Sequence, residues 1–191
     1  MDKEEFEFNE QDHLNNEGYR KNIKDVFVHY TSNGKIPKGG KLLDLGAITP
    51  SILDEAKLLG FETTGWDMFK RKDSGHDFIV GDFETEETLK TFDVIWANHV
   101  FEHFHYPLEV LKKCYNLLND KGKLFVGMPD PFFIAFENVY NWSHWLLRSH
   151  HIMWDMDSFC DEAEKVGFKT IMKHRNTEVN PQMDMHLIFE K

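Results

Sequence analysis

The chain has 191 residues, a length that suits one domain with a sizeable hydrophobic core. Its hydrophobic fraction of 41% and aromatic fraction of 14% exclude a disordered or low-complexity chain. The net charge is −11, from 22 basic and 33 acidic side chains, so nucleic acid and anionic membranes would meet net repulsion. We therefore expect neither nucleic acid nor a membrane as a partner.

The cysteines and the first residues bear on the cellular compartment. Cys114 and Cys160 each fall in an expected helix, which indicates neither a disulfide framework nor a thiolate metal site. Residues 2–5 are charged, unlike a signal peptide, and no uninterrupted apolar run is long enough to cross a bilayer. The largest basic cluster, residues 70–72, has acidic neighbours and predicts a solvated loop. We expect a cytoplasmic protein.

Residues 1–38 are predicted to form an N-terminal helical cap over the core. Apolar residues recur there at the spacing of an amphipathic helix. They are Tyr19, Ile23, Val26, Phe27 and Tyr30. A turn at 37–40, which contains proline and glycine, separates this helix from the rest of the chain.

Short apolar runs that end in polar turns predict β-strands. The runs are 41–46, 62–67, 77–81, 92–97, 123–128, 169–173 and 185–190. Helical periods lie between several of them, one ending at Gly60, one beginning at Pro107 and one ending at Gly167. A further short helix is suggested over 84–89. Strands that alternate with helices predict an α/β fold with a doubly wound, mostly parallel sheet and ligand sites at the carboxyl ends of its strands.

The turn after the first strand has the features of a nucleoside site without those of a pyrophosphate site. A dinucleotide fingerprint needs G-x-G-x-x-G, and this turn retains only Gly46. Asp67 ends the second strand about 20 positions later, where a carboxylate accepts hydrogen bonds from ribose hydroxyls. The pattern therefore favours a nucleoside-containing ligand that lacks a pyrophosphate.

Five motifs together resemble class I S-adenosylmethionine-dependent methyltransferases of the small-molecule type. They are LLDLGAITPS, GWDMF, VGDF, FDVIWANHVFEHF and LLNDKGKLFVGMPD, and the resemblance runs from about Gly39 to the C-terminus. It implies one methyltransferase domain over 1–191, with a Rossmann-like sheet of seven strands, helices on both faces and an antiparallel last strand. Within this domain, we interpret the aromatic-rich segment 130–155 as an inserted lid over the methyl acceptor.

The resemblance also implies S-adenosylmethionine as the cofactor, and it assigns the residues that would contact it. Grouped by the part of the cofactor that they would border, these are Asp44, Leu45, Gly46 and Ala47 at the methionine portion, Asp67 and Met68 at the ribose, Asp82 and Phe83 at the adenine, and Asn98 and His99 beneath the sulfonium. Ile48 and Pro50 stand where the family has further glycines. Structural roles as turn or cap residues remain open for the acidic members of this set.

Histidines are the candidate catalytic bases, because a hydroxyl acceptor must lose its proton during methyl transfer. Several lie after the fourth or the fifth strand, in segments that face the ligand in this architecture: His99, His103, His105, His144, His150 and His151. We choose His99 and His150 as catalytic candidates. A packing or surface role remains the alternative for each histidine.

The sequence contains two patterns that resemble metal sites, but we predict no metal at either. Residues 99–103 fit the zinc pattern H-x-x-E-H, which requires a regular helix where a strand end is expected. His150 and His151 with Asp155 suggest an iron triad, but adjacent histidines on an extended chain point apart.

The function that we expect is transfer of a methyl group from S-adenosylmethionine to a hydroxyl of a small molecule, with an amine as the second choice of acceptor. One alternative is a binding or interaction protein that keeps the fold without turnover, suggested by Ile48 and Pro50 in the cofactor turn. A nucleotide-dependent oxidoreductase is a third hypothesis, based on fold analogy alone.

The cofactor prediction can be checked by thermal shift. S-adenosylmethionine and S-adenosylhomocysteine should each raise the melting temperature, because a ligand that binds only the folded state stabilises it, whereas NAD should not. A shift with NAD alone would favour the oxidoreductase hypothesis instead.

Overall fold

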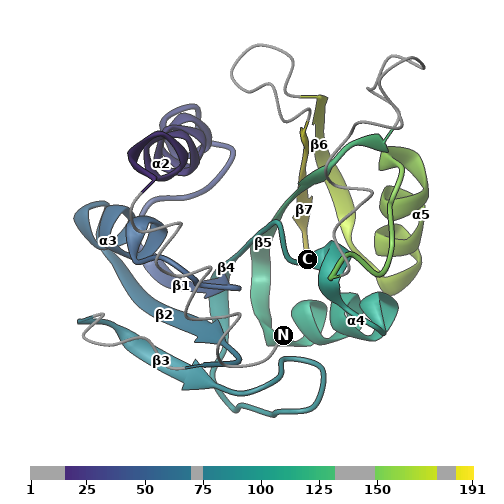
Figure 1. Cartoon of the computed structure of the whole chain (residues 1–191), viewed down its shortest axis with the longest axis horizontal. Helices are drawn as coiled ribbons and strands as arrows, with labels where there is room; N and C mark the ends of the chain where they lie inside the picture. The colour runs from purple at the N-terminus through teal and green to yellow at the C-terminus, as the bar shows by residue number, and fades with distance from the viewer. Residues whose placement is uncertain (1–15, 70–74, 132–148, 176–183) are drawn as a thin grey trace.

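The computed structural model describes residues 16–69, 75–131, 149–175 and 184–191 and contains one seven-stranded sheet (Figure 1). Its strands are β1 Gly40–Leu45, β2 Phe61–Asp67, β3 Asp77–Val80, β4 Phe92–Asn98, β5 Leu118–Pro129, β6 Lys169–Arg175 and β7 Asp184–Glu190. The strand order is β3-β2-β1-β4-β5-β7-β6. β7 runs antiparallel to β5 and to β6, and the other pairs are parallel. The expected α/β fold, with its antiparallel last strand, is confirmed.

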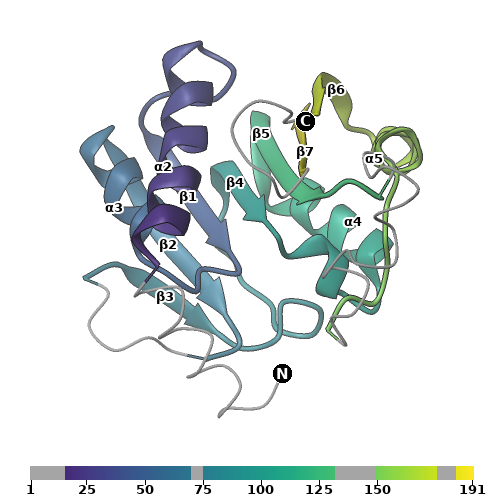
Figure 2. The same ribbon diagram turned by 45° about the horizontal axis from the view of Figure 1, so that its top comes forward.

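Helices cover both faces of this sheet, as expected. They are α2 Glu17–Ser32, α3 Ser51–Leu58, α4 Pro107–Leu117 and α5 Met156–Val166, together with a short 3-10 helix, η1 Phe101–His103. Figures 1 and 2 show α2 and α3 on one side of the sheet and α4 and α5 on the other. Within the described residues, no helix combines the length and the apolar character needed to cross a membrane.

Alternation along the strands divides the core into two layers. Towards α2 and α3, the ring of Trp96 stacks on that of Phe125 with centroids 3.6 Å apart, and Phe27 of α2 meets Trp96 edge-on at 5.1 Å. Towards α4 and α5, Phe159 packs against Phe101 and Phe189 with centroid distances of 5.2 and 5.9 Å. Both faces of the sheet are therefore buried, which explains why its strands read as continuous apolar runs.

The predicted helix over 84–89 is wrong. The chain forms a turn there, in which the backbone N–H groups of Thr85 and Glu86 donate to the carbonyl of Asp82, and Leu89 is fully exposed. The Lys113 ammonium of α4 donates to the carbonyl oxygens of Phe83 and Glu86, which a continuing helix would need for its own bonds. A tertiary contact therefore replaces the local helix.

The start of β5 also differs from the prediction, which began this strand at residue 123. Leu118 already pairs with Phe92 of β4, and a bulge follows before the regular register resumes. The Asn119 amide donates to Asp93 Oδ1 at 2.8 Å, which holds the irregular segment against β4. The strand therefore begins where α4 ends.

Some predicted features lie outside the described residues: residues 1–15 of the N-terminal cap, the basic cluster 70–72 and residues 132–148 of the proposed lid. The described end of the lid segment contains Trp154, which packs edge-on against Phe159 with centroids 5.3 Å apart. This tryptophan therefore belongs to the core layer under α5. Asp155, a candidate iron ligand in the sequence, accepts a hydrogen bond from the backbone N–H of Ser158 and caps α5.

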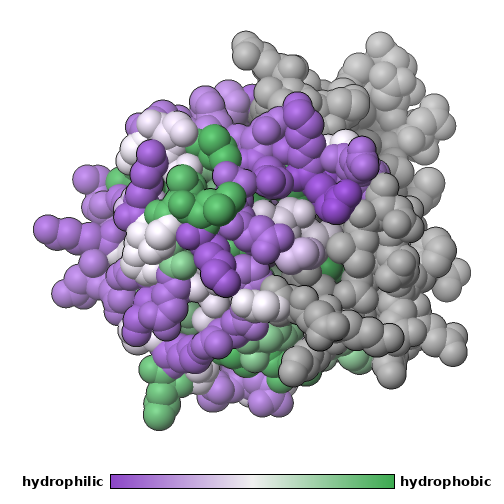
Figure 3. Space-filling model, turned by 90° about the vertical axis from the view of Figure 1, so that its left-hand side faces the viewer, coloured by the Kyte–Doolittle hydropathy of each residue, from purple (hydrophilic) through white to green (hydrophobic). Residues whose placement is uncertain are grey.

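The molecular surface agrees with the acidic composition. The face that carries α2, α3 and β3 is mainly hydrophilic, with hydrophobic side chains in small groups (Figure 3). Where the described residues are visible, this face shows no broad apolar surface of the kind that marks a protein or membrane contact.

A tyrosine–histidine pair is buried between α2 and the sheet. Tyr30 Oη lies 3.0 Å from His186 Nδ1. Burial raises the pKa of Tyr30 to about 12, so its hydroxyl stays protonated and can donate a hydrogen bond to Nδ1. Burial also lowers the pKa of His186 to about 4, an effect that outweighs the opposing influence of Asp184. His186 therefore folds as a neutral imidazole.

The stability of the protein should fall on acidification because of His186. Its folded pKa of about 4 lies below the ordinary histidine value of 6.5, so the unfolded state binds more protons between these values. We expect the free energy of unfolding to drop by roughly 3 kcal/mol between pH 6.5 and pH 4, at about 1.4 kcal/mol per pKa unit. Urea unfolding across this range checks it, and His186→Phe should flatten the profile. An equal slope in that variant would assign the pH dependence to other groups.

Candidate active site

The carboxyl ends of three neighbouring parallel strands bring the predicted cofactor residues together. Leu45 of β1 pairs with Trp66 of β2 and with Ala97 of β4. The residues that follow these three positions are Gly46, Asp67 and Asn98, so they lie side by side at one edge of the sheet. The strand order reverses at β1, between β2 and β4, which is where doubly wound sheets bind ligands.

Gly46 is required by both backbone conformation and space. Its φ is 74°, in the left-handed region, and a Cβ at this position would lie 3.0 Å from Val100 Cγ2. Its N–H donates to the carbonyl of Trp66 at 2.9 Å. Because the side chains of Leu45 and Ala47 are buried in the core, this turn can offer a ligand mainly backbone groups.

The departures from the family's glycines have a local explanation. Pro50 has φ −73° and stands at the N-cap of α3, a position that its ring tolerates. Ile48 donates its N–H to the carbonyl of Gly46 at 2.7 Å, which tightens the turn without a second glycine. No side chain caps the N-terminus of α3, so its first amides suit an anionic group.

Asp67 is half-buried at the end of β2. Its Oδ1 accepts a hydrogen bond from the N–H of Met68 at 2.7 Å, which orients the carboxylate. Its carbonyl accepts from Gly81 at 3.0 Å and links β2 to the loop after β3. Met68 is exposed beside it. This carboxylate can accept ribose hydroxyls, as the sequence predicts.

The loop after β3 gives its side chains structural contacts. Asp82 Oδ1 accepts from the N–H of Glu84 at 2.9 Å, and the Phe83 ring is buried 4.7 Å from Trp66, centroid to centroid. Lys113, which sequence reasoning missed, donates to the carbonyl of Phe83 at 2.8 Å and lies 4.8 Å above its ring. An adenine contact here would therefore use the backbone of a loop that Lys113 holds in place.

His99 has an unusual backbone conformation at the end of β4. Its φ is 53°, which non-glycine residues rarely adopt, and its N–H donates to the carbonyl of Gly127 at 2.8 Å. A Cβ on Gly127 would lie 2.2 Å from Asn98 Oδ1, so this glycine makes room for the Asn98 amide. Both predicted residues are thus held by β5.

The His99 imidazole lies between two buried carboxylates. Nε2 is 3.1 Å from Asp184 Oδ2, and Nδ1 is 3.3 Å from Glu102 Oε1. Burial alone would lower the pKa of His99, but the two carboxylates raise it well above its ordinary value. Burial likewise opposes ionisation of Glu102, yet His99 lowers the pKa of that carboxyl on balance. His99 is therefore an imidazolium at neutral pH.

The second catalytic candidate, His150, lies close to the same carboxylate. One ligand atom of each of Glu102, His103 and His150 lies within 4.8 Å of the others. The backbone N–H of His151 donates to the carbonyl of Glu102 at 2.8 Å and holds this segment in place. The structure thus brings both His99 and His150 close to Glu102. That glutamate was visible only as part of the H-x-x-E-H pattern, and Asp184 carried no sequence signal.

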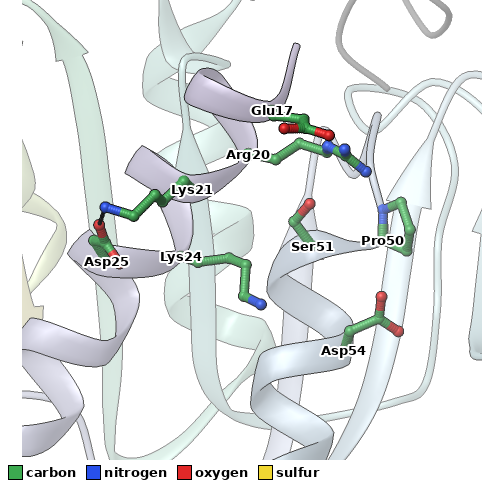
Figure 4. Close-up of a pocket in the computed structure, with 8 residues that line it drawn as sticks. All are labelled: Glu17, Arg20, Lys21, Lys24, Asp25, Pro50, Ser51 and Asp54. Atoms are coloured by element: carbon green, nitrogen blue, oxygen red, sulfur yellow. Dashed lines mark ion pairs between the residues drawn. The ribbon is translucent and has the colours of Figure 1, made fainter. Parts of the chain in front are cut away.

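A groove between α2 and the N-terminus of α3 adjoins the cofactor turn (Figure 4). Arg20 extends from α2 towards Pro50, and its Nε is buried without a hydrogen-bond partner among the described residues. Lys21 pairs with Asp25 at 3.2 Å on the same helix. Sequence reasoning missed Arg20, because an arginine on an amphipathic helix usually indicates only a solvated face.

The strand order, the left-handed turn at Gly46 and the carboxylate at the end of β2 are the features expected of a class I methyltransferase. The chain belongs to a family of methyltransferase domains, whose model matches residues 12–173. No curated protein matches the sequence closely enough to count as a relative.

Solved structures of methyltransferases share the fold. An S-adenosylmethionine-dependent methyltransferase from Archaeoglobus fulgidus has a TM-score of 0.68 and 16% identity, with 90% of this chain and 94% of that chain covered. One from Mesorhizobium loti has a TM-score of 0.68 and 12% identity, covering 88% and 100%. The N-methyltransferase NodS from Bradyrhizobium japonicum, in complex with S-adenosylhomocysteine, has a TM-score of 0.64 and 12% identity, covering 94% and 90%.

The protein is an S-adenosylmethionine-dependent methyltransferase. Its residues fit this cofactor, which carries an ammonium, a carboxylate and a sulfonium but no phosphate. The left-handed Gly46 and the uncapped α3 offer backbone groups, and Asp67 offers a carboxylate. Both the oxidoreductase hypothesis and that of a binding protein without turnover lose their support.

Asp67→Ala should weaken cofactor binding by about 1 to 3 kcal/mol, because the ribose hydroxyls lose their acceptor. Calorimetric titration with S-adenosylhomocysteine measures this loss. The matched control is Asp161→Ala, which removes an exposed carboxylate from α5. Equal affinities for both variants would remove Asp67 from the site.

His99→Gln should destabilise the protein by about 3 to 5 kcal/mol, because two buried carboxylates lose their cation. The raised pKa means that this stabilisation is complete below pH 6.5 and disappears as the pH rises through the folded value. Urea unfolding at pH 7 measures it. Adding Asp184→Asn should recover part of the loss, and a near-neutral single variant would show that His99 does not balance these charges.

Proposed function

We propose that this methyltransferase modifies a hydroxyl group of a small molecule, with an amine as the second choice of acceptor. The observation that carries the proposal is the group of histidines around Glu102, immediately after Asn98 at the end of β4. Methyl transfer to a hydroxyl requires removal of a proton, whereas a neutral amine already has a free lone pair. Proton-handling side chains beside the acceptor therefore favour the hydroxyl.

The cofactor supplies the methyl group as a sulfonium. Gly46 and the amides at the start of α3 bind its methionine portion, and the Arg20 guanidinium binds the carboxylate of that portion. Asp67 binds the ribose hydroxyls. The half-buried position of Asp67 supports its role, and so does the Nε of Arg20, which is buried and has no hydrogen-bond partner in the described part of the chain.

The two catalytic candidates have different roles in this proposal. His99 is protonated, and its two N–H groups face Asp184 and Glu102, so it holds these carboxylates in place beside the acceptor and does not accept a proton. His150 is the proton acceptor, with Glu102 beside it to stabilise the charge that the imidazole gains. The raised pKa of His99 supports this division.

A small molecule is favoured over nucleic acid as the acceptor. The net charge of −11 opposes the approach of a polyanion, and no described helix presents an uninterrupted basic face. The carboxylates beside His99 would likewise repel a phosphate close to the methyl group. The acceptor that suits this site is therefore small and carries no phosphate at the reacting end.

The acceptor class is tested with labelled S-adenosylmethionine and pairs of compounds that differ only by a hydroxyl or an amine. Methylation of the hydroxyl members supports the proposal, and methylation of the amines alone contradicts it. His150→Gln should lower kcat by about 100-fold, within the range for general-base catalysis, and leave cofactor affinity unchanged. His151→Gln, at the exposed neighbouring position, is the matched control and should keep its activity.

A further inference from the structure

Glu102, His103 and His150 form a cluster with the donor set of a metal site. One candidate ligand atom from each lies within 4.8 Å of the other two. Two imidazoles and one carboxylate are a donor set that binds zinc and other divalent transition ions. Glu102 is buried and the two histidines are half-buried, so an ion would be held at depth and reached from the histidine side.

Glu102 is the strongest individual indication of a missing cation. Its residue is 2% exposed, and neither carboxylate oxygen accepts a hydrogen bond within the described residues. Within the described residues, its ion pair is with the His99 imidazolium, which it shares with Asp184, so one cation serves two buried carboxylates. Buried carboxylates are costly unless their charge is balanced. A divalent ion held by Glu102, His103 and His150 would supply the missing positive charge.

The hydrogen bond made by one nitrogen of the His103 ring leaves the other nitrogen available for a metal. Its Nδ1 lies 2.9 Å from the carbonyl oxygen of Ser149, which can only accept, so Nδ1 carries the hydrogen. Nε2 then keeps its lone pair. Metal-binding histidines usually donate their other N–H to a carbonyl or carboxylate in this way, which fixes the ring and its tautomer.

The backbone holds the three side chains together before any ion arrives. Glu102 and His103 lie in η1, where the N–H of His103 donates to the carbonyl of Val100 at 3.1 Å. His150 is held there by the bond from His151 to the Glu102 carbonyl, and its ring centroid lies 4.8 Å from that of His103. The site therefore needs little ordering on binding.

This arrangement differs from the metal pattern in the sequence. The H-x-x-E-H pattern pairs His99 with His103, but the His99 ring is held between Asp184 and Glu102. His150, distant in sequence, occupies the place that the pattern gives to His99. Residues 101–103 form the short 3-10 helix η1 and not a regular α-helix. The sequence prediction of no metal depends on the absence of a regular helix there.

We infer that Glu102, His103 and His150 bind one divalent transition ion of the zinc class, which coordinates the hydroxyl of the methyl acceptor. The catalytic part of this inference depends on the proposed hydroxyl acceptor. Three protein ligands leave positions open for a substrate oxygen, and such coordination lowers the pKa of a hydroxyl. When the ion is bound, His150 is one of its ligands and no longer accepts the hydroxyl proton. The ion then promotes loss of that proton by lowering the pKa of the hydroxyl.

The step is balanced without a redox partner. The acceptor O–H bond breaks and its proton passes to water. The oxygen–carbon bond then forms as the methyl–sulfur bond breaks, and that electron pair stays on sulfur to give an uncharged thioether. No atom changes oxidation state through the ion, so a redox-inert metal such as zinc is sufficient.

Metal binding is tested on the full chain without substrate. The purified protein is stripped with chelator and titrated with Zn²⁺ against a chromophoric competitor, and the bound metal is counted by mass spectrometry. We expect one ion per chain and a loss of affinity of about 100-fold or more in His103→Gln and in His150→Gln, since each removes a ligand. A protein that binds no stoichiometric zinc would overturn the site.

Matched controls come from the adjacent exposed pair of histidines. The rings of His105 and His151 lie 4.0 Å apart, and their variants His105→Gln and His151→Gln should retain the zinc affinity of the parent protein. If these variants lose zinc while His103→Gln and His150→Gln retain it, the proposed ligands are wrong. Binding of S-adenosylhomocysteine by every variant establishes that it is folded.

The catalytic role has a separate readout. Removing the ion should lower methylation of a hydroxyl acceptor at least tenfold, and adding Zn²⁺ back should restore it. Full activity of the metal-free protein would overturn the role of the ion and leave His150 as the base. Stoichiometric zinc on a protein that methylates only amines would refute the proposed acceptor while the metal site itself stands.

Discussion

The register of three parallel strands is the constraint on which this protein depends. Hydrogen bonding of β1 to β2 and to β4 ends all three strands at the same level, so Gly46, Asp67 and Asn98 meet at one edge. A slip of one residue would turn the side chains of a strand to the opposite face and separate this group. The buried aromatic layers on both sides of the sheet oppose such a slip, because each residue is matched to its own layer.

The charged group around His99 depends on that edge and gives the site its chemical character. Two carboxylates and one imidazolium are buried together, and neither sign would be stable there alone. The left-handed backbone of His99 turns its ring towards both acids, so local strain and electrostatic attraction are coupled. Glu102 connects this group to His103 and His150, so the cluster extends from the end of β4 to the segment before α5.

Much of the fold could be predicted from the sequence, because buried strands and amphipathic helices have distinct periods. All seven expected strands are present, and Pro107 and Gly167 mark helix boundaries as expected. The wrong predictions concern two short segments. The segment 84–89 has polar residues that suit a helix, but Lys113 takes the carbonyls that such a helix needs. Leu118 extends β5 because it finds a partner in Phe92.

The sequence by itself determined where the seven strands fall along the chain, the glycine turn at 46 and the carboxylate at 67, because each depends on spacing along the chain. Only the tertiary structure decided which groups meet at the end of β4. Asp184 and His150 carry no local pattern that links them to His99, and β7 and the segment before α5 bring them there. Buried charges are balanced by groups that are close in space but distant in sequence. The protonation of His99 and the contacts of Glu102 are therefore known only from the folded structure.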